Sequence, residues 1–85
     1  MKQYHSYRRL PSINMLRQMM YIIDALPASL ASTILRWMKW YAFEECEPSI
    51  EQITSDSRLE DAWYVIKMNL DQQFEKWAAY LDRKG

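Results

Sequence analysis

The sequence has few of the residues that form turns and cross-links, with one glycine, three prolines and one cysteine among 85 residues. Because the only glycine is Gly85, no glycine-rich loop for phosphate binding is available. Because Cys46 is the only cysteine, no internal disulfide can form, and we expect a soluble protein of the reducing cytoplasm. The apolar run Met19–Ile23 is far shorter than the roughly 20 residues that span a bilayer, so we expect no membrane segment. The shortage of turn residues favours an all-helical fold.

The residues that are present are strongly apolar. Hydrophobic residues make up 49% of the chain and aromatic residues 14%, which is too apolar for a disordered protein. The length predicts one domain. A domain of this size buries only about 60–65% of the surface that its unfolded chain exposes, so binding to a partner or to a second copy would add stability.

The net charge of zero conceals an uneven distribution of charge. Residues 1–43 carry six Lys or Arg and one Asp, whereas residues 44–85 carry ten acids and five bases. The bases are scattered along the first half. We therefore interpret the asymmetry as attraction between helix faces, in preference to a nucleic-acid footprint.

The first part of the chain predicts an arm and one helix. Residues 1–11 show no clear period, and Pro11 disfavours helical geometry before it, so we predict a short N-terminal arm that packs through its two tyrosines. Residues 12–85 are predicted to form a single helical domain. Its first helix starts from an N-cap at Ser12 and runs to about residue 25. The expected core residues of this helix recur at helical spacing and are Leu16, Met19, Met20 and Ile23.

Pro27 is tolerated in the first turn of a helix, so a second helix is predicted from there to Phe43 or Glu44. Residues 44–56 are predicted to form an acidic loop with room for one helical turn. The isoleucines expected to point inward from this loop are Ile50 and Ile53.

A third helix is predicted from Ser57, whose spacing to Glu60 matches a capping box. It carries a single apolar seam of Leu59, Trp63, Ile66, Leu70, Phe74, Trp77 and Leu81. At about 1.5 Å per residue this helix is long enough for its last turns to overhang the others, where it could pair with its own copy or with another protein. The predicted fold is therefore all-α, a three-helix bundle with a long C-terminal helix and a short N-terminal arm.

The second helix has more large apolar groups than one buried face can use. One stripe faces the core and consists of Leu30, Ile34, Trp37, Met38 and Tyr41. Two further aromatic residues fall nearly opposite this stripe, beside two bases, and the third helix presents a tyrosine and a methionine away from its seam. Aromatic residues and Arg are enriched at protein interfaces. The predicted partner-binding residues are Arg36, Lys39, Trp40, Phe43, Tyr64 and Met68.

The sequence offers little for catalysis or for metal binding. A metal site needs several His, Cys or carboxylate ligands at matched spacing, and this chain has one His in the arm and one Cys in the acidic loop. A nucleophile would have only His5 as its base. We therefore expect no enzyme, no cofactor and no metal, but a protein that binds another protein.

Three other interpretations stay open. Trp40 and Phe43 could belong to the core, because large rings bury much area in a small domain. A helix-turn-helix DNA-binding module would place Ser32, Arg36 and Lys39 against DNA, although two bulky rings on that face suit a protein groove better. The acids of the loop could imitate nucleic-acid phosphates toward a basic partner. These acids are Glu44, Glu45, Glu47 and Glu51.

Three segments resemble a known family. They are AspAlaLeuProAlaSerLeuAla at 24–31, TrpTyrAlaPheGluGluCysGluPro at 40–48 and AlaTrpTyrValIleLysMetAsnLeuAsp at 62–71. Over about residues 20–80 the chain is similar to a small helical domain of unknown function that typically stands at the front of phage replication-initiation or helicase-loader-like proteins. The loop glycine that is usual in that family is replaced here by the GluGluCys run.

The resemblance implies a phage or mobile-element protein associated with DNA replication, with a bacterial or phage protein as its partner. It carries no catalytic motif. A copy that acts apart from the larger replication protein could serve another task, such as inhibition of a host enzyme or defence complex of the anti-CRISPR or anti-restriction type.

Overall fold

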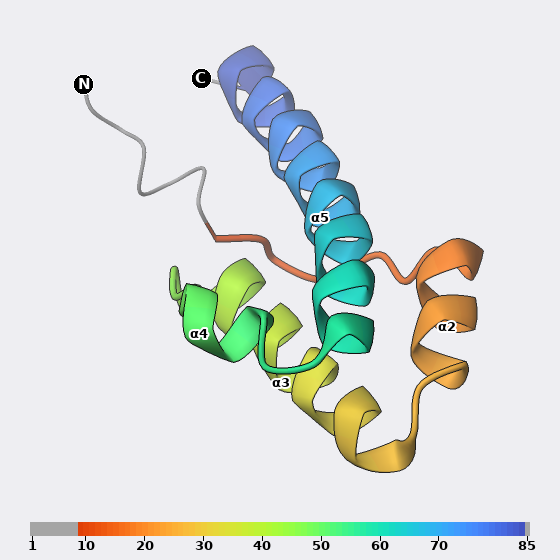
Figure 1. Ribbon diagram of the computed structural model, residues 1–85. Coiled ribbons are helices and arrows are strands. Elements are labelled where there is room, and N and C mark those ends of the chain that lie inside the picture. Colours follow the sequence, from red (N-terminus) through yellow and green to blue (C-terminus); the bar gives the residue numbers. More distant parts are fainter. Residues whose placement is uncertain (1–8, 85) are drawn as a thin grey trace.

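The computed structural model describes residues 9–84 of the chain, and these residues form helices without strands (Figure 1). In this part of the chain there are four helices, α2 (Arg17–Asp24), α3 (Ala28–Phe43), α4 (Ile50–Ile53) and α5 (Ser57–Lys84). The all-α class is confirmed. The three-helix bundle is not confirmed, because the helical turn expected within the acidic loop forms as α4. Most of the predicted arm, including Tyr4, His5 and Tyr7, lies outside the described residues.

The helix α3 has the bounds that the sequence predicts. It begins directly after Pro27, whose carbonyl accepts a hydrogen bond from the Ala31 N–H at 2.9 Å. It ends before Glu45, which adopts the left-handed conformation with a φ of 52°. That conformation costs a residue with a side chain roughly 1–2 kcal/mol relative to glycine. Arg9 holds the Glu45 carboxylate at 2.7 Å in this turn.

The core lies where α3 packs against α5. Trp63 of α5 meets the rings of Trp37 and Tyr41 of α3 with centroids 5.8 and 5.7 Å apart, and Tyr41 meets Phe74 at 5.6 Å. The interplanar angles of 79°, 83° and 82° are those of edge-to-face contacts, which add about 0.5–1.5 kcal/mol each beyond area burial. The predicted stripe of α3 is confirmed, with only Leu30 half-buried.

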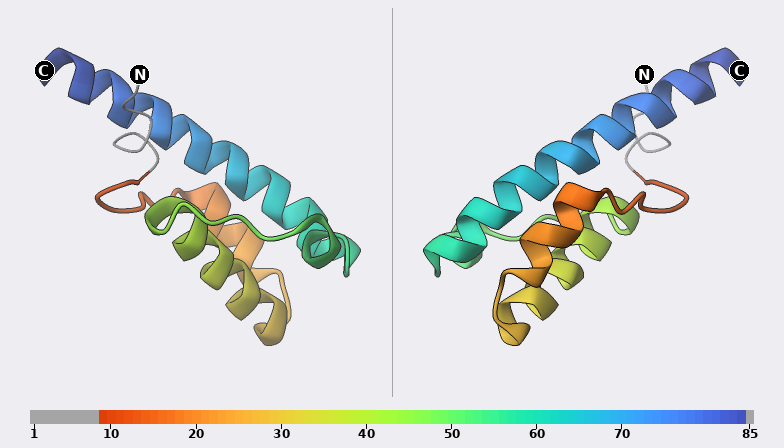
Figure 2. Two further views of the ribbon diagram at one scale, coloured as in Figure 1. Left: turned by 90° about the vertical axis from the view of Figure 1, so that its left-hand side faces the viewer. Right: turned by 90° about the vertical axis from the view of Figure 1, so that its right-hand side faces the viewer.

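The helix α5 carries the predicted seam but begins from a different cap. Its seam residues are buried from Leu59 to Phe74 and half-buried at Trp77 and Leu81. Figure 2 shows the C-terminal turns of α5 extending past α2 and α3, as its length predicts. Trp77 still packs against the edge of the core and stacks on Tyr80 with ring centroids 5.3 Å apart.

The predicted capping box at Ser57 is wrong by one residue. The carbonyl of Asp56 accepts from the Glu60 N–H at 3.0 Å, and its carboxylate accepts from the Arg58 N–H at 2.8 Å. Asp is as effective an N-cap as Ser, and the Arg58 guanidinium adds an ion pair at 3.1 Å. Hydrogen bonds from the side chain and backbone of Arg58 hold the pKa of Asp56 below its ordinary value.

The first helix is shorter than the sequence predicts. The predicted N-cap, Ser12, is exposed, and α2 begins five residues later, at Arg17, after a segment that Gln73 of α5 contacts. The Gln73 amide accepts from the Asn14 N–H and donates to the Asn14 carbonyl, both at 2.9 Å. In α2 only Met19 and Ile23 are buried. The expectation that Leu16 and Met20 face the core is wrong, since they are 37% and 49% exposed.

The acidic loop is tied to the rest of the molecule by ion pairs. Glu44 lies 3.7 Å from Lys39 of α3, and Glu47 lies 3.9 Å from Lys67 of α5, in addition to the pair that Arg9 makes with Glu45. Three of the four loop acids therefore already have basic partners, and two of these pairs join the basic and acidic halves of the chain, although neither pair joins two helix faces as the sequence predicts.

Of the two loop isoleucines expected to point inward, one does and the other does not. Ile53 of α4 is buried at 5% exposure, whereas Ile50 is 58% exposed. A helix of four residues presents only one side to the core, so the first residue of α4 points to solvent. A capping box closes the start of α4, because Ser49 accepts from the Gln52 N–H and Gln52 accepts from the Ser49 N–H.

Candidate partner-binding groove

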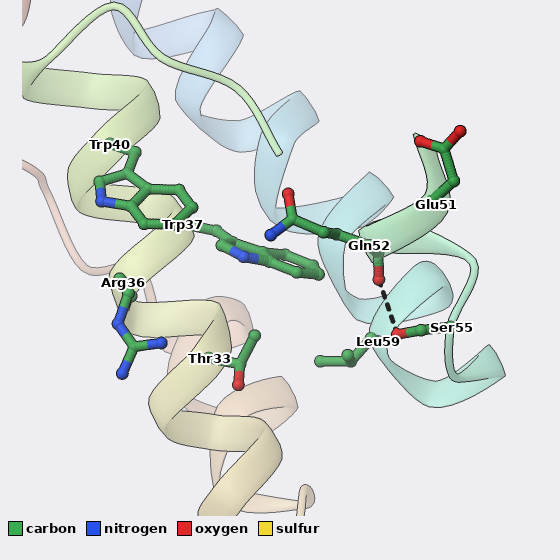
Figure 3. Close-up of a pocket in the computed structure, with 8 residues that line it drawn as sticks. All are labelled: Thr33, Arg36, Trp37, Trp40, Glu51, Gln52, Ser55 and Leu59. Atoms are coloured by element: carbon green, nitrogen blue, oxygen red, sulfur yellow. Dashed lines mark hydrogen bonds between the residues drawn. The ribbon is translucent and has the colours of Figure 1, made fainter. Parts of the chain in front are cut away.

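A groove of about 430 Å³ lies between α3 and α4, and we call it the Trp40 groove (Figure 3). Its α3 wall comes from one side of that helix, and its opposite wall comes from α4, the following turn and the start of α5. The lining residues are Thr33, Arg36, Trp37, Trp40, Glu51, Gln52, Ser55 and Leu59.

The groove exists because α4 is too short to cover its side of α3. No Cα atom of α4 lies within 8 Å of a Cα atom of α3, whereas α5 and α2 both approach α3 closely. Only Ile53 of the four α4 residues is buried. The space beside Trp37 and Trp40 is therefore left open to solvent.

The floor of the groove is apolar and fixed by the core. Trp37 is 3% exposed and Leu59 is 5% exposed. Trp40 is half-buried and packs against the edge of the core. Residues three apart in a helix lie on adjacent turns of one side, so Trp40 follows Trp37 along the same wall. The expectation that Trp40 lies nearly opposite the core is therefore wrong, although part of its ring still faces solvent.

The polar groups of the groove include two charges without internal partners. Among residues 9–83, no acid forms an ion pair with Arg36 and no base forms one with Glu51. Figure 3 shows these two side chains on opposite sides of the groove, with the Gln52 side chain extending between them toward Trp37. The groove can therefore offer a cation, an anion and an amide to an occupant.

The structure separates the six predicted partner-binding residues. Arg36 and Trp40 come together in the groove. Lys39 and Phe43 lie on α3 outside the lining, with Phe43 37% exposed and Lys39 paired with the acidic loop. The remaining two residues are exposed on α5 and do not line the groove. They are Tyr64 and Met68, at 48% and 58% exposure.

Sequence reasoning missed the α4 wall of the groove. The sequence places Glu51 in the predicted acidic loop and indicates no role for Gln52 or Ser55. The spacing of Ser49 and Gln52 matches a capping box and was the available signal for a helix here. The meeting of α4 with the Trp40 side of α3 has no local signal, because it depends on the path of the loop.

A polar cluster lies on the side of α3 that packs against α5, next to the aromatic core. The Tyr41 hydroxyl donates a hydrogen bond to the Asp71 carboxylate. The Lys67 ammonium lies 5.2 Å from the centroid of the Tyr41 ring and 3.5 Å from Asp71. Burial, together with the hydrogen bond to Asp71, raises the pKa of Tyr41. Partial burial alone would lower the pKa of Lys67, but the surrounding negative charges outweigh it and the net pKa is raised.

The described part of the chain has no group of three or more His, Cys, Asp or Glu side chains placed to hold a metal ion. None of the helices in this part is long and apolar enough to cross a membrane.

Comparison of this chain with protein-family models, with curated proteins and with solved structures finds no match. The resemblance to the phage replication domain therefore stays a prediction that rests on the three segments that carry it.

Proposed function

We propose that this protein is a non-enzymatic binding module that contacts a partner protein through the Trp40 groove. The observation that carries the proposal is the partly exposed Trp40 ring beside Arg36, a cation without an ion-pair partner among the described residues. Trp and Arg are the residues most enriched among interface hot spots, which lie in well-packed pockets. The buried floor is already ordered by the core, so a partner would lose little free energy in ordering it.

The contact surface extends along α3 beyond the groove. Phe43 lies one turn after Lys39 and is exposed, so it can pack against the same partner. The Lys39–Glu44 pair is exposed on both sides, with a separation of 3.7 Å, and contributes little to folding. A partner can therefore compete for Lys39 at small cost.

The resemblance to a phage replication domain supports a replication protein as the partner. The alternative task, inhibition of a host enzyme or defence complex, would use the same surface. The two roles differ in one measurable respect, because an inhibitor blocks the activity of its target at a stoichiometric ratio and an adaptor does not.

The DNA-binding alternative has less support. The α3 helix carries two exposed apolar side chains, Leu35 and Phe43, and only two bases, Arg36 and Lys39. A DNA-reading helix would need several bases free for phosphates, and its affinity would fall steeply as salt rises.

Affinity capture from a nuclease-treated bacterial lysate tests the proposal. Three tagged proteins are compared: the native chain, the double variant Arg36→Gln with Trp40→Ala, and the control Tyr21→Ser, which removes an aromatic ring that is 67% exposed on α2. Circular dichroism must show that all three are folded. We expect one partner to be retained by the native chain and the control and lost by the double variant. Equal retention by all three would reject the groove as the binding site.

A further inference from the structure

The hydrogen-bonding groups of the Trp40 groove specify what kind of segment it accepts. Gln52 uses its Oε1 atom to accept from the Ser49 N–H at 2.9 Å. A backbone N–H can only donate, so the orientation of the Gln52 amide is determined and its NH₂ group is directed elsewhere as a donor. Together with Arg36, this places two donors in the groove, and both can donate to an oxygen acceptor on the occupant.

The two hydroxyl groups of the lining can act as hydrogen-bond acceptors for an occupant. Thr33 donates its proton to the Ser29 carbonyl at 3.0 Å, and Ser55 donates its proton to the Gln52 carbonyl at 2.8 Å (Figure 3). Each oxygen keeps lone pairs that accept hydrogen bonds. An occupant that offers both N–H donors and C=O acceptors is matched to these walls, and a peptide backbone offers both.

Charge and apolar area complete the description of the occupant. Arg36 stands at the α3 wall beside the Trp40 ring and has no internal ion pair among residues 9–83, so a carboxylate at this point would gain a charge-assisted hydrogen bond. Glu51 lines the opposite wall, also without an ion pair among these residues, and would repel a carboxylate, so the carboxylate of the occupant is placed at Arg36, away from Glu51. Trp37 and Leu59 of the floor are almost fully buried, so the half-buried Trp40 ring supplies exposed apolar area for one aliphatic or aromatic side chain of the occupant. We infer that the Trp40 groove binds an acidic peptide segment of the partner, with an apolar side chain on the floor and a neighbouring carboxylate at Arg36. This inference rests on the proposed function.

Short blocked peptides test this chemistry without the partner. The probes are acetyl-Glu-Leu-Glu-amide, its neutral analogue with Gln at both ends, its basic analogue with Lys at both ends, and acetyl-Glu-Ala-Glu-amide. Each is titrated into the full-length ¹⁵N-labelled protein at low salt, and the indole N–H signals of Trp37 and Trp40 are followed. We expect the acidic leucine peptide to shift these signals with a dissociation constant on the order of 1 mM. We expect each of the other three to bind roughly 3-fold more weakly or worse.

Two variants locate the carboxylate. Arg36→Gln should remove the difference between the Glu and Gln peptides, whereas Arg17→Gln, which removes an exposed cation from α2, should leave that difference intact. A preference for the Lys peptide, equal binding of Glu and Gln peptides, or no shift of either indole up to about ten times the expected dissociation constant would overturn the inference.

The outcome is separable from that of the capture experiment. A partner captured through the groove, with no peptide preference, would keep the proposed function and reject only the acidic segment. Peptide binding at Arg36 with no captured partner would reject the proposed function.

Discussion

The two sides of α3 have the same kinds of side chain and opposite environments. Toward α5, Tyr41 and Trp37 meet Trp63 edge to face, and Asp71 accepts the Tyr41 hydroxyl proton. Toward α4, the Trp40 ring is half-buried beside a groove of about 430 Å³. The side chains alone do not explain the difference, because both sides present large rings.

The length of the opposing helix explains it. The helix α5 has 28 residues and covers its side of α3, whereas α4 has four residues and stays more than 8 Å away, Cα to Cα. Packing energy scales with the apolar area that both elements bury. We therefore regard the α5 side as the stabilising side of α3 and the α4 side as its binding side, and the variants below test this division in order of decreasing effect on stability.

The largest effect is expected from Trp63→Ala. Trp63 is fully buried, and its removal leaves a cavity and ends two ring contacts, which should lower the free energy of unfolding by about 3–5 kcal/mol. Urea denaturation followed by circular dichroism measures the loss. Trp63→Phe is the matched control and should lose less, because it keeps a ring and removes an indole N–H that lacks a hydrogen-bond partner among the described residues. A loss below about 1 kcal/mol for the alanine variant would contradict the division.

Trp40→Ala should cost about 1–2 kcal/mol of folding free energy, because part of the ring is already exposed. The same variant should abolish partner capture, which Tyr21→Ser should not. Comparing the losses of unfolding free energy of Trp40→Ala and Trp63→Ala therefore shows how differently the two rings contribute to stability. Unfolding of the Trp40 variant at room temperature would place this ring in the stabilising core and not in an interface.

The polar cluster of the closed side predicts a loss of stability at alkaline pH. Folding raises the pKa of Tyr41 and of Lys67 above their ordinary values of 10.0 and 10.5. The unfolded chain therefore releases these protons first, and the free energy of unfolding should fall as pH rises above about 10. Urea midpoints from about pH 8 to about pH 11 measure this slope.

Tyr41→Phe isolates the contribution of the hydroxyl group. It should lower the free energy of unfolding at neutral pH by about 1 kcal/mol, because the hydrogen bond to Asp71 is lost. It should also make the alkaline slope shallower. An unchanged slope would show that other groups cause the pH dependence.

The smallest effect, and one of opposite sign, is expected from filling the groove. Thr33→Leu replaces a hydroxyl that bonds back to the Ser29 carbonyl with an apolar side chain over the floor. It should raise stability by about 0.5 kcal/mol and weaken partner binding by occupying the groove. Leu35→Ile, on the exposed outer face of α3, is the control for a change of side chain without filling. Stronger binding by the Thr33 variant would count against the groove.

Much of the helical pattern was predictable because it depends on local periodicity. The stripe of α3 and the seam of α5 follow from spacings of three and four residues, and Pro27 marks the start of α3. The start of the first helix was less predictable from local pattern, because residues distant in the chain contact each other there. Ser12 does not start a helix, and in the segment that follows it the Asn14 backbone is hydrogen-bonded by Gln73, 59 residues further along the chain than Asn14.

The candidate site was predictable only in part for the same reason. The sequence predicts Arg36 and Trp40 as partner-binding residues, and both line the groove, but it also predicts Tyr64 and Met68, which lie apart from the groove on α5. Glu51 and Gln52 became part of the site only through the path of the loop, which depends on the left-handed Glu45 and its pair with Arg9.

The sequence by itself determined the all-helical class, the positions of the long helices and the residues that face the core, because hydrophobic periodicity and proline act within a few residues. Only the tertiary structure decided which side of α3 is closed and which is open. Which side is closed depends on the lengths of α4 and α5 and on contacts between residues distant in the chain. As a result, Trp63 is buried in the core and Trp40 lies beside a groove.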